Sequence, residues 1–174
     1  MKTFLISDTH FGHANIIKYC DRPFANVDEM DQAIIKNWNS VVAPDDKVYH
    51  LGDVTLSKKK LYILDHLNGT KVLIRGNHDI FKLKDYMPYF KDVRATHELG
   101  GYILSHIPLH DSQKQRFRGN IHGHIHEKNL PDPWYYNISV EQIGYTPITL
   151  EQAMKRYSRF NIRRKESAKN DILS

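Results

Sequence analysis

Five short polar segments of this chain contain residue types that bind divalent cations. They are rich in aspartate, histidine and asparagine, and they span residues 7–10, 52–53, 76–79, 105–106 and 123–126. Carboxylate and amide oxygens together with imidazole nitrogens suit borderline or hard cations such as Zn²⁺, Mn²⁺ and Fe²⁺. The only cysteine is Cys20, which argues against a thiolate zinc site. The segments therefore predict a metal site of oxygen and nitrogen ligands.

The spacing within these segments supports a shared site. Asp8 and His10 are two residues apart, as are His124 and His126. At a strand end the two-residue side-chain period would point both members of each pair to the same side. Gly52, Gly76 and Gly123 each stand immediately before a candidate ligand. We expect a close backbone approach at these glycines, where a Cβ atom would obstruct the site.

The elements that must position these residues alternate between strands and helices. Runs rich in β-branched and aromatic residues predict strands, and two stretches with helical spacing, residues 27–42 and 57–67, lie between them. This alternation favours an α/β layer architecture, and in such sheets ligands bind at the carboxyl ends of the strands. The predicted strands cover residues 3–7, 47–51, 71–75, 101–105, 119–123 and 134–140.

The length of the chain predicts its domain organisation. We expect the 174 residues to form a single domain, 1–174, in which residues 149–174 are a basic C-terminal helix and tail. Thr149 and Gln152 have the spacing of a capping box, and the inner stripe of this helix would hold Ala153, Met154, Tyr157 and Phe160.

The distribution of charge bears on possible partners. Residues 151–174 carry a net charge of +4 out of the total of +5, which leaves +1 for the first 150 residues. A nucleic-acid partner is therefore possible but not favoured, because a binding face should lie on the folded body. The apolar run at the N-terminus is too short for a signal peptide or a membrane span, so we expect a cytoplasmic protein without a membrane partner.

Taken together and in this order, the polar segments resemble the five motifs of the calcineurin-like metallophosphoesterase superfamily. The resemblance covers residues 1 to about 140, and residues 11–17 resemble a subgroup of small bacterial and phage members. It implies a four-layer sandwich of two facing β-sheets flanked by helices. The segments are Asp8-Thr9-His10, Gly52-Asp53, Gly76-Asn77-His78-Asp79, His106 and Gly123-His124-Ile125-His126.

The resemblance also implies a ligand set for two divalent metal ions. Asp8, His10 and His126 would hold the first ion; Asn77, His106 and His124 would hold the second; and Asp53 would bridge the two. Mn²⁺ is the expected metal, with iron, zinc or nickel as alternatives.

The implied activity is phosphoester hydrolysis, with phosphodiesters favoured over phosphomonoesters. A hydroxide held between the two metals would attack phosphorus, while His78 would protonate the leaving group and Asp79 would orient His78. The substrate would be a phosphorylated small molecule or a nucleotide. Val54-Thr55-Leu56 follows Asp53, rather than the Asp-Arg-Gly of the serine/threonine phosphatases, so protein phosphatase activity is not expected.

Two other functions and three further site residues stay open at this point. A nuclease of the same superfamily and a non-catalytic scaffold that retains the fold are the alternatives to a small-molecule phosphoesterase. His13 and Arg22 follow the first motif and could line the pocket, where Arg22 could bind a substrate phosphate through two N–H groups. His110 precedes a cationic loop that could steer phosphorylated substrates, although a solvated loop explains it equally well.

Overall fold

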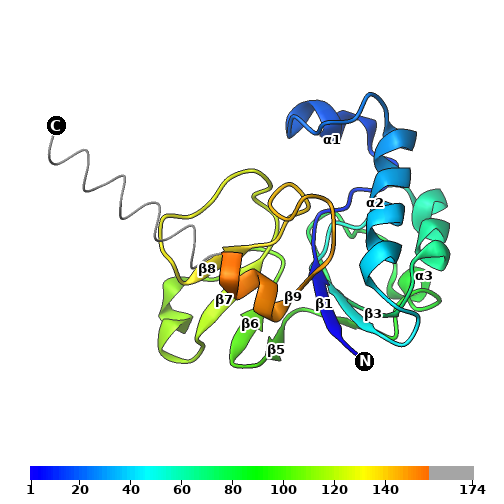
Figure 1. Ribbon diagram of the computed structural model, residues 1–174. Coiled ribbons are helices and arrows are strands. Elements are labelled where there is room, and N and C mark those ends of the chain that lie inside the picture. The colour runs from blue at the N-terminus through cyan, green and yellow to red at the C-terminus, as the bar shows by residue number, and fades with distance from the viewer. Residues whose placement is uncertain (157–174) are drawn as a thin grey trace, which may run out of the picture.

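A mixed sheet with four parallel strands forms one half of the molecule. The computed structural model describes residues 1–156, and its first sheet has the strand order β4–β3–β2–β1–β9 (Figure 1). Strands β1 to β4 are parallel, and β9 pairs antiparallel with β1. The strands are β1 Thr3–Ile6, β2 Lys47–His50, β3 Thr70–Ile74, β4 Asp92–Arg94 and β9 Ile148–Thr149.

A second sheet faces the first and has the order β5–β6–β7–β8. Its strands are β5 His97–Leu99, β6 Tyr102–Leu104, β7 Gly119–His122 and β8 Tyr135–Asn137. Strands β6, β7 and β8 are parallel, so their carboxyl ends also lie at one edge. An isolated parallel bridge between Ser7 and Ser139 joins the two sheets beside the end of β1. The predicted α/β architecture of two facing sheets is confirmed.

The helices stand mainly on the outer side of the five-stranded sheet (Figure 1). The apolar stripe of α2 contributes Met30, Ile34 and Trp38, none of which is exposed to solvent. Burying each of these side chains stabilises the fold by roughly 1.5–3 kcal/mol. The helices are α1 Ala14–Tyr19, α2 Val27–Val41, α3 Leu83–Tyr86 and the 3₁₀ helices η1 Lys58–His66 and η2 Asp111–Gln115.

The differences from the sequence prediction lie in short or irregular elements. The predicted helix at 57–67 is the 3₁₀ helix η1, and Ser57 makes no side-chain cap; its backbone N–H instead donates to Thr55 Oγ1 at 3.1 Å. Strands β4, β5 and β9 were not predicted. Each has only two or three residues and none of them is fully buried, so the apolar alternation that signals a strand is missing.

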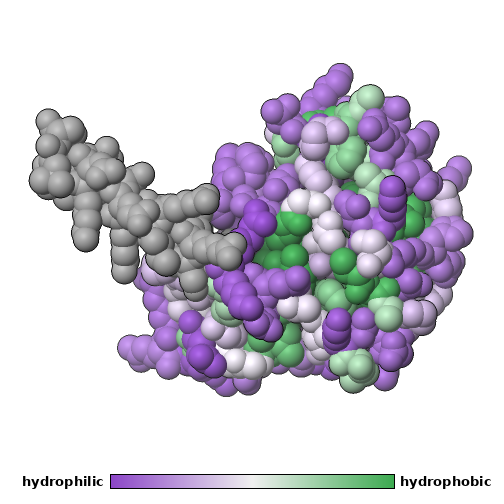
Figure 2. Space-filling view, viewed as in Figure 1, coloured by the Kyte–Doolittle hydropathy of each residue, from purple (hydrophilic) through white to green (hydrophobic). Residues whose placement is uncertain are grey.

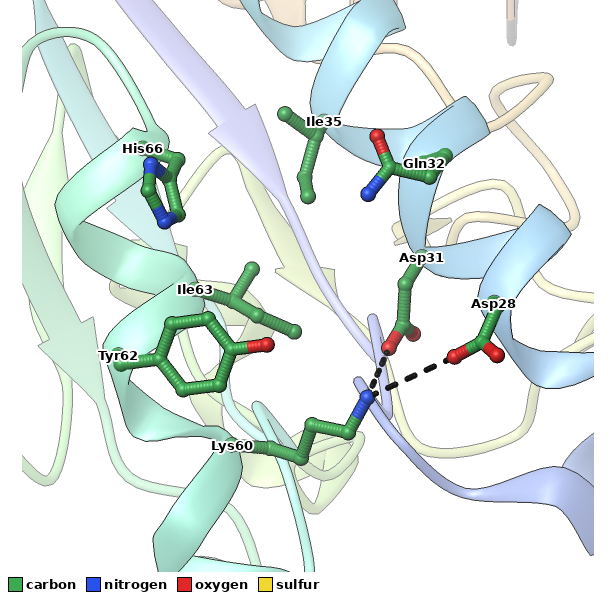
Figure 3. Close-up of a pocket in the computed structure, with 8 residues that line it drawn as sticks. All are labelled: Asp28, Asp31, Gln32, Ile35, Lys60, Tyr62, Ile63 and His66. Atoms are coloured by element: carbon green, nitrogen blue, oxygen red, sulfur yellow. Dashed lines mark hydrogen bonds and ion pairs between the residues drawn. The ribbon is translucent and has the colours of Figure 1, made fainter.

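Asp31 links α2 to η1 through an ion pair and to the loop after β1 through a hydrogen bond. Lys60 Nζ lies 3.2 Å from Asp31 Oδ2 and 3.9 Å from Asp28 Oδ1, at one side of a pocket of about 200 Å³ between the two helices (Figure 3). The other carboxylate oxygen of Asp31 accepts a hydrogen bond from Gly12 N at 3.0 Å. The helix layer therefore helps to hold the loop that carries the first polar segment.

The C-terminal helix begins with the predicted capping box. Thr149 N donates to Gln152 Oε1 at 2.7 Å, and Gln152 N donates to Thr149 Oγ1 at 3.2 Å. Helical residues follow from 150 to 156, and Ala153 is fully buried. Tyr157 and Phe160, predicted for the same stripe, lie outside the described residues.

The surface is mostly polar where the helices face solvent, and apolar residues come to the surface chiefly in the middle of the face drawn in Figure 2. Within residues 1–156, no helix has both the length and the apolar character needed to cross a bilayer.

The N-terminus of α2 offers a test of the helix layer. Asn26 Oδ1 accepts a hydrogen bond from Glu29 N at 2.9 Å, so Asn26→Ala should lower the free energy of unfolding by about 1 kcal/mol. Urea denaturation measures this change. Asn15→Ala is the matched control, because the exposed Asn15 makes no described side-chain hydrogen bond, and an equal loss in both variants would contradict the capping role.

Candidate metal centre

The predicted ligands stand on turns in which the backbone is left-handed. The φ angles are 60° at Asp8, 49° at His10, 57° at Asp53, 70° at His124 and 50° at His126. The expectation that both members of each pair point to the same side rested on an extended strand end, whereas the chain turns at these residues. Such a conformation costs a non-glycine residue about 1–3 kcal/mol and persists only where the surroundings fix it. Strain of this kind collects at functional sites.

Asp8, His10 and His126 form the first cluster. One ligand atom from each lies within 4.8 Å of the others. His10 is 1% exposed, and neither of its ring nitrogens has a hydrogen-bond partner within residues 1–156. Burial lowers the pKa of His10 to about 2, so the ring is neutral and its lone pair is free to bind a cation. Two unpaired buried nitrogens are costly unless a ligand binds them, so this donor set fits a metal ion.

Asp53, His106 and His124 form the second cluster, with ligand atoms again within 4.8 Å of one another. Asn77 joins them, since its Oδ1 lies 2.8 Å from His106 Nε2. His106 Nδ1 donates to the carbonyl oxygen of Leu51 at 2.7 Å, because a carbonyl can only accept. That bond leaves Nε2 facing the cluster.

Asp53 lies between the two clusters. Its Oδ2 is 3.3 Å from His106 Nε2 and 3.7 Å from His10 Nε2. Burial raises the pKa of Asp53, but the hydrogen bond and charge of His106 outweigh this effect and bring the pKa to about 2. The carboxylate is therefore ionised and is shared between both ligand sets.

The close backbone approach expected at the glycines is present. A Cβ atom on Gly123 would lie 2.0 Å from Ser7 Oγ and 2.2 Å from Asp8 Oδ2. On Gly76 it would lie 2.2 Å from Asp53 Oδ1. At these two positions even a methyl group would displace a ligand carboxylate.

Hydrogen bonds from the second sheet fix the carboxylate of Asp8. His124 N donates to both of its oxygens, at 3.1 and 3.0 Å, and Ser139 Oγ donates to Oδ2 at 2.9 Å. Asp8 follows β1, whereas His124 and Ser139 follow β7 and β8. The first metal position is therefore built across the junction between the sheets.

Glu141 is a functional residue that the sequence analysis missed. Its Oε1 lies 3.0 Å from His126 Nδ1, and a carboxylate whose pKa is lowered can only accept, so the proton is on Nδ1 and Nε2 faces Asp8. Burial lowers the pKa of His126, but hydrogen bonds with Cys20 and Glu141 and the charge of Asp8 raise it to about 10. The signal available in the sequence was the position of Glu141 directly after the predicted strand 134–140.

Arg22, which was predicted to line the pocket, points into the protein interior instead. Its side chain is fully buried, and its Nε and NH2 donate to Glu141 Oε1 at 2.9 and 2.7 Å. The guanidinium also donates to the carbonyl oxygens of Asp8 and Thr9, at 2.8 and 3.1 Å. The buried carboxylate of Glu141 and the carbonyls of the first motif bind the guanidinium in the interior. Arg22 therefore stabilises the loop that carries Asp8 and the side chain of Glu141.

Asp79 also acts differently from the prediction. Its carboxylate accepts hydrogen bonds from the backbone N–H groups of Asp53, Val54 and Gly76, at 2.8–3.0 Å. It makes no hydrogen bond with His78 among the described residues, so it does not orient that ring directly. Burial raises the pKa of Asp79, while these N–H groups oppose the shift. Asp79 instead holds the second and third motif loops together.

His78 and His13 lie at the first cluster, whereas His110 does not. The rings of His78 and His13 have their centroids 5.7 Å from that of His10. Burial, together with the charges of His78 and Arg22, lowers the pKa of His13. The side chain of His110 is 83% exposed, and its described partners are Asp111 and Ser112. His110 is therefore not brought into contact with the centre.

Removing the negative charge from Glu141 tests its part in the centre. Glu141→Gln should weaken divalent-metal binding roughly 10- to 100-fold, because the variant weakens the hydrogen bond to His126 and leaves the Arg22 charge unbalanced behind the first cluster. Titration calorimetry with Mn²⁺ measures the affinity. Glu98→Gln, at an exposed position whose side chain makes no described hydrogen bond or ion pair, is the control. Equal affinities in both variants would refute the role of Glu141.

Comparison with known proteins agrees with this geometry. The family model for the calcineurin-like phosphoesterase superfamily domain matches residues 1–142. An uncharacterized protein of Methanocaldococcus jannaschii is 47% identical over 168 residues, covering 88% of this chain and 90% of that protein. The Gene 66 protein of Mycobacterium phage L5 is 32% identical over 161 residues, covering 71% and 77%.

A solved structure matches as well. The crystal structure of a protein of unknown function from Aquifex aeolicus has a TM-score of 0.71 at 29% identity, covering 88% of this chain and 97% of that one. The chain therefore belongs to the calcineurin-like phosphoesterase superfamily, whose members hydrolyse phosphoesters and typically use divalent metals.

Proposed function

We propose that this protein hydrolyses phosphodiesters with two divalent cations, Mn²⁺ foremost, bound at adjoining positions. The observation that carries the proposal is the position of Asp53, whose Oδ2 faces a histidine of each cluster at 3.7 and 3.3 Å. A carboxylate placed in this way can serve two cations at once. Iron, zinc and nickel suit the same oxygen and nitrogen donors.

The charge of the ligand set supports a phosphoryl substrate. Bound cations would activate water and neutralise the phosphoryl oxygens. Two carboxylates, Asp8 and Asp53, oppose the charge of the cations, and the described imidazole ligands add no negative charge when neutral. Net positive charge therefore remains to attract an anionic phosphoester.

We assign to His78 the protonation of the leaving group. Its ring lies beside that of His10 and its side chain is exposed at the mouth of the centre. The backbone N–H of His78 donates to Asp53 Oδ1 at 2.9 Å, which fixes the turn relative to the ligands. An exposed ring beside the first cluster suits a general acid, which has to meet the leaving group of a bound ester.

The space beside the second cluster favours a diester over a monoester. A cleft of about 690 Å³ is lined by Asn77 and His106, both of the second ligand set. A diester keeps an organic group on each side of phosphorus, and this cleft has room for the group that does not leave. Compact family members without long insertions often act on diesters, which supports the same choice by analogy. We propose a phosphorylated small molecule or a nucleotide as the physiological substrate.

Nitrophenyl esters test the reaction and its preference. With Mn²⁺ present, the bis(p-nitrophenyl) ester of phosphate should be hydrolysed with a kcat/KM at least about ten-fold above that of p-nitrophenyl phosphate, because only the diester fills the cleft. Release of nitrophenol is followed by absorbance. Removing metal with a chelator should abolish turnover, and restoring Mn²⁺ should recover it. Absence of turnover of both esters by the Mn²⁺-loaded protein would end the proposal.

Replacing His78 tests the general acid. His78→Ala should keep the metal content of the native protein but lower kcat by roughly 10²- to 10⁴-fold with an alkyl or phenyl leaving group. The loss should be smaller with p-nitrophenol, which departs without a proton. His66→Ala, on the exposed side of η1, is the matched control. Equal losses for all leaving groups would show that His78 does not donate a proton.

A further inference from the structure

The cleft beside the second cluster has an apolar wall. It lies between the segments that follow β3 and β6, and α3 and the end of β4 close its other sides. Asn77 and His106 line it, together with the apolar side chains of Leu83, Val93, Ile107 and Leu109. The cleft thus combines two candidate metal ligands with apolar side chains.

Two of these apolar side chains are open to solvent. Leu83 is 53% exposed and Ile107 is 49% exposed. Ile80 and Met87, in the same segment as Leu83, are 67% and 48% exposed. Exposed apolar side chains that line a cleft are typical of a surface that binds an apolar ligand. Because Leu83 and Ile107 line the same cleft as His106, the apolar group that they bind would be part of the substrate.

The cleft also holds a cation whose charge is not balanced by a carboxylate. Arg75 Nε donates to the carbonyl oxygen of Asp79 at 2.7 Å, and its NH2 donates to that of Phe81 at 2.8 Å. No ion pair with a carboxylate is made by Arg75 within residues 1–156, whereas Arg94 Nε lies 2.6 Å from Asp92 Oδ2. Arg75 therefore keeps its positive charge beside Asn77, where the negative charge of a phosphodiester would be stabilised.

We propose that this cleft binds the second ester substituent of the substrate, and that this substituent is an apolar organic group of ring size or larger. The inference rests on the proposed phosphodiesterase activity and adds the class of substrate. Leu83 and Ile107 contact the apolar group, and Arg75 faces the anionic phosphate. Esters with a small substituent leave these side chains in water and gain less binding energy.

Two diesters with one leaving group test this specificity. Methyl p-nitrophenyl phosphate and phenyl p-nitrophenyl phosphate release the same nitrophenol, so any difference in rate reports the second substituent. We expect kcat/KM with Mn²⁺ to be at least about ten-fold higher for the phenyl ester, the lower end of what a buried apolar group contributes to specificity. The variants Leu83→Ser and Ile107→Ser should each bring the phenyl-to-methyl ratio toward one. Tyr62→Ser, at an apolar side chain that is 51% exposed beside the pocket between α2 and η1, should leave the ratio unchanged.

A binding measurement that needs no turnover completes the test. In the metal-free protein, diphenyl phosphate should shift the methyl resonances of Leu83 and Ile107, and dimethyl phosphate should not. Equal kcat/KM for the two nitrophenyl esters, with no such shifts, would overturn the apolar subsite and leave the phosphodiesterase activity standing. Shifts without turnover of either ester would keep the subsite and overturn the activity.

Discussion

The carboxylate of Asp8 is the contact on which the centre depends. It is fully buried just after β1, and it accepts hydrogen bonds from His124 and Ser139, which lie 116 and 131 residues further along the chain. A buried carboxylate without such donors would cost several kcal/mol. Docking of the two sheets supplies the donors. The same docking brings His126 next to Asp8, so the sheet junction and the first metal position form together.

Several features of the centre are unfavourable for folding. Five ligand residues have left-handed backbones, and His10 is buried with two unpaired ring nitrogens. These features destabilise the fold locally unless a ligand offsets them. Burial of the strands that lead into the ligands offsets this destabilisation, because these strands end in fully buried residues such as Ile6 and Leu104. Metal binding and folding should therefore be thermodynamically linked in this protein.

Two further carboxylates act on the candidate ligands without belonging to the predicted ligand set. Asp79 accepts three backbone N–H groups and ties the loops after β2 and β3, while Glu141 joins Arg22 to His126. Both are buried, and both use charge to fix geometry. A ligand that can turn freely loses metal affinity, so outer contacts of this kind matter nearly as much as the ligands.

The sequence by itself determined the candidate ligands, the glycines beside them and the succession of the main strands. These features are local: a residue type, its immediate neighbour and a short apolar run can be read directly, and parallel strands bring their carboxyl ends to one edge. Only the tertiary structure decided the roles of Arg22, Asp79 and Glu141. Arg22 and Glu141 are 119 residues apart, so no local pattern could show that they would pair, and an arginine near a phosphate motif suits a substrate contact equally well. The left-handed turns and the short strands β4, β5 and β9 were likewise set by packing between distant segments, because their own residues carry too weak a preference to specify them.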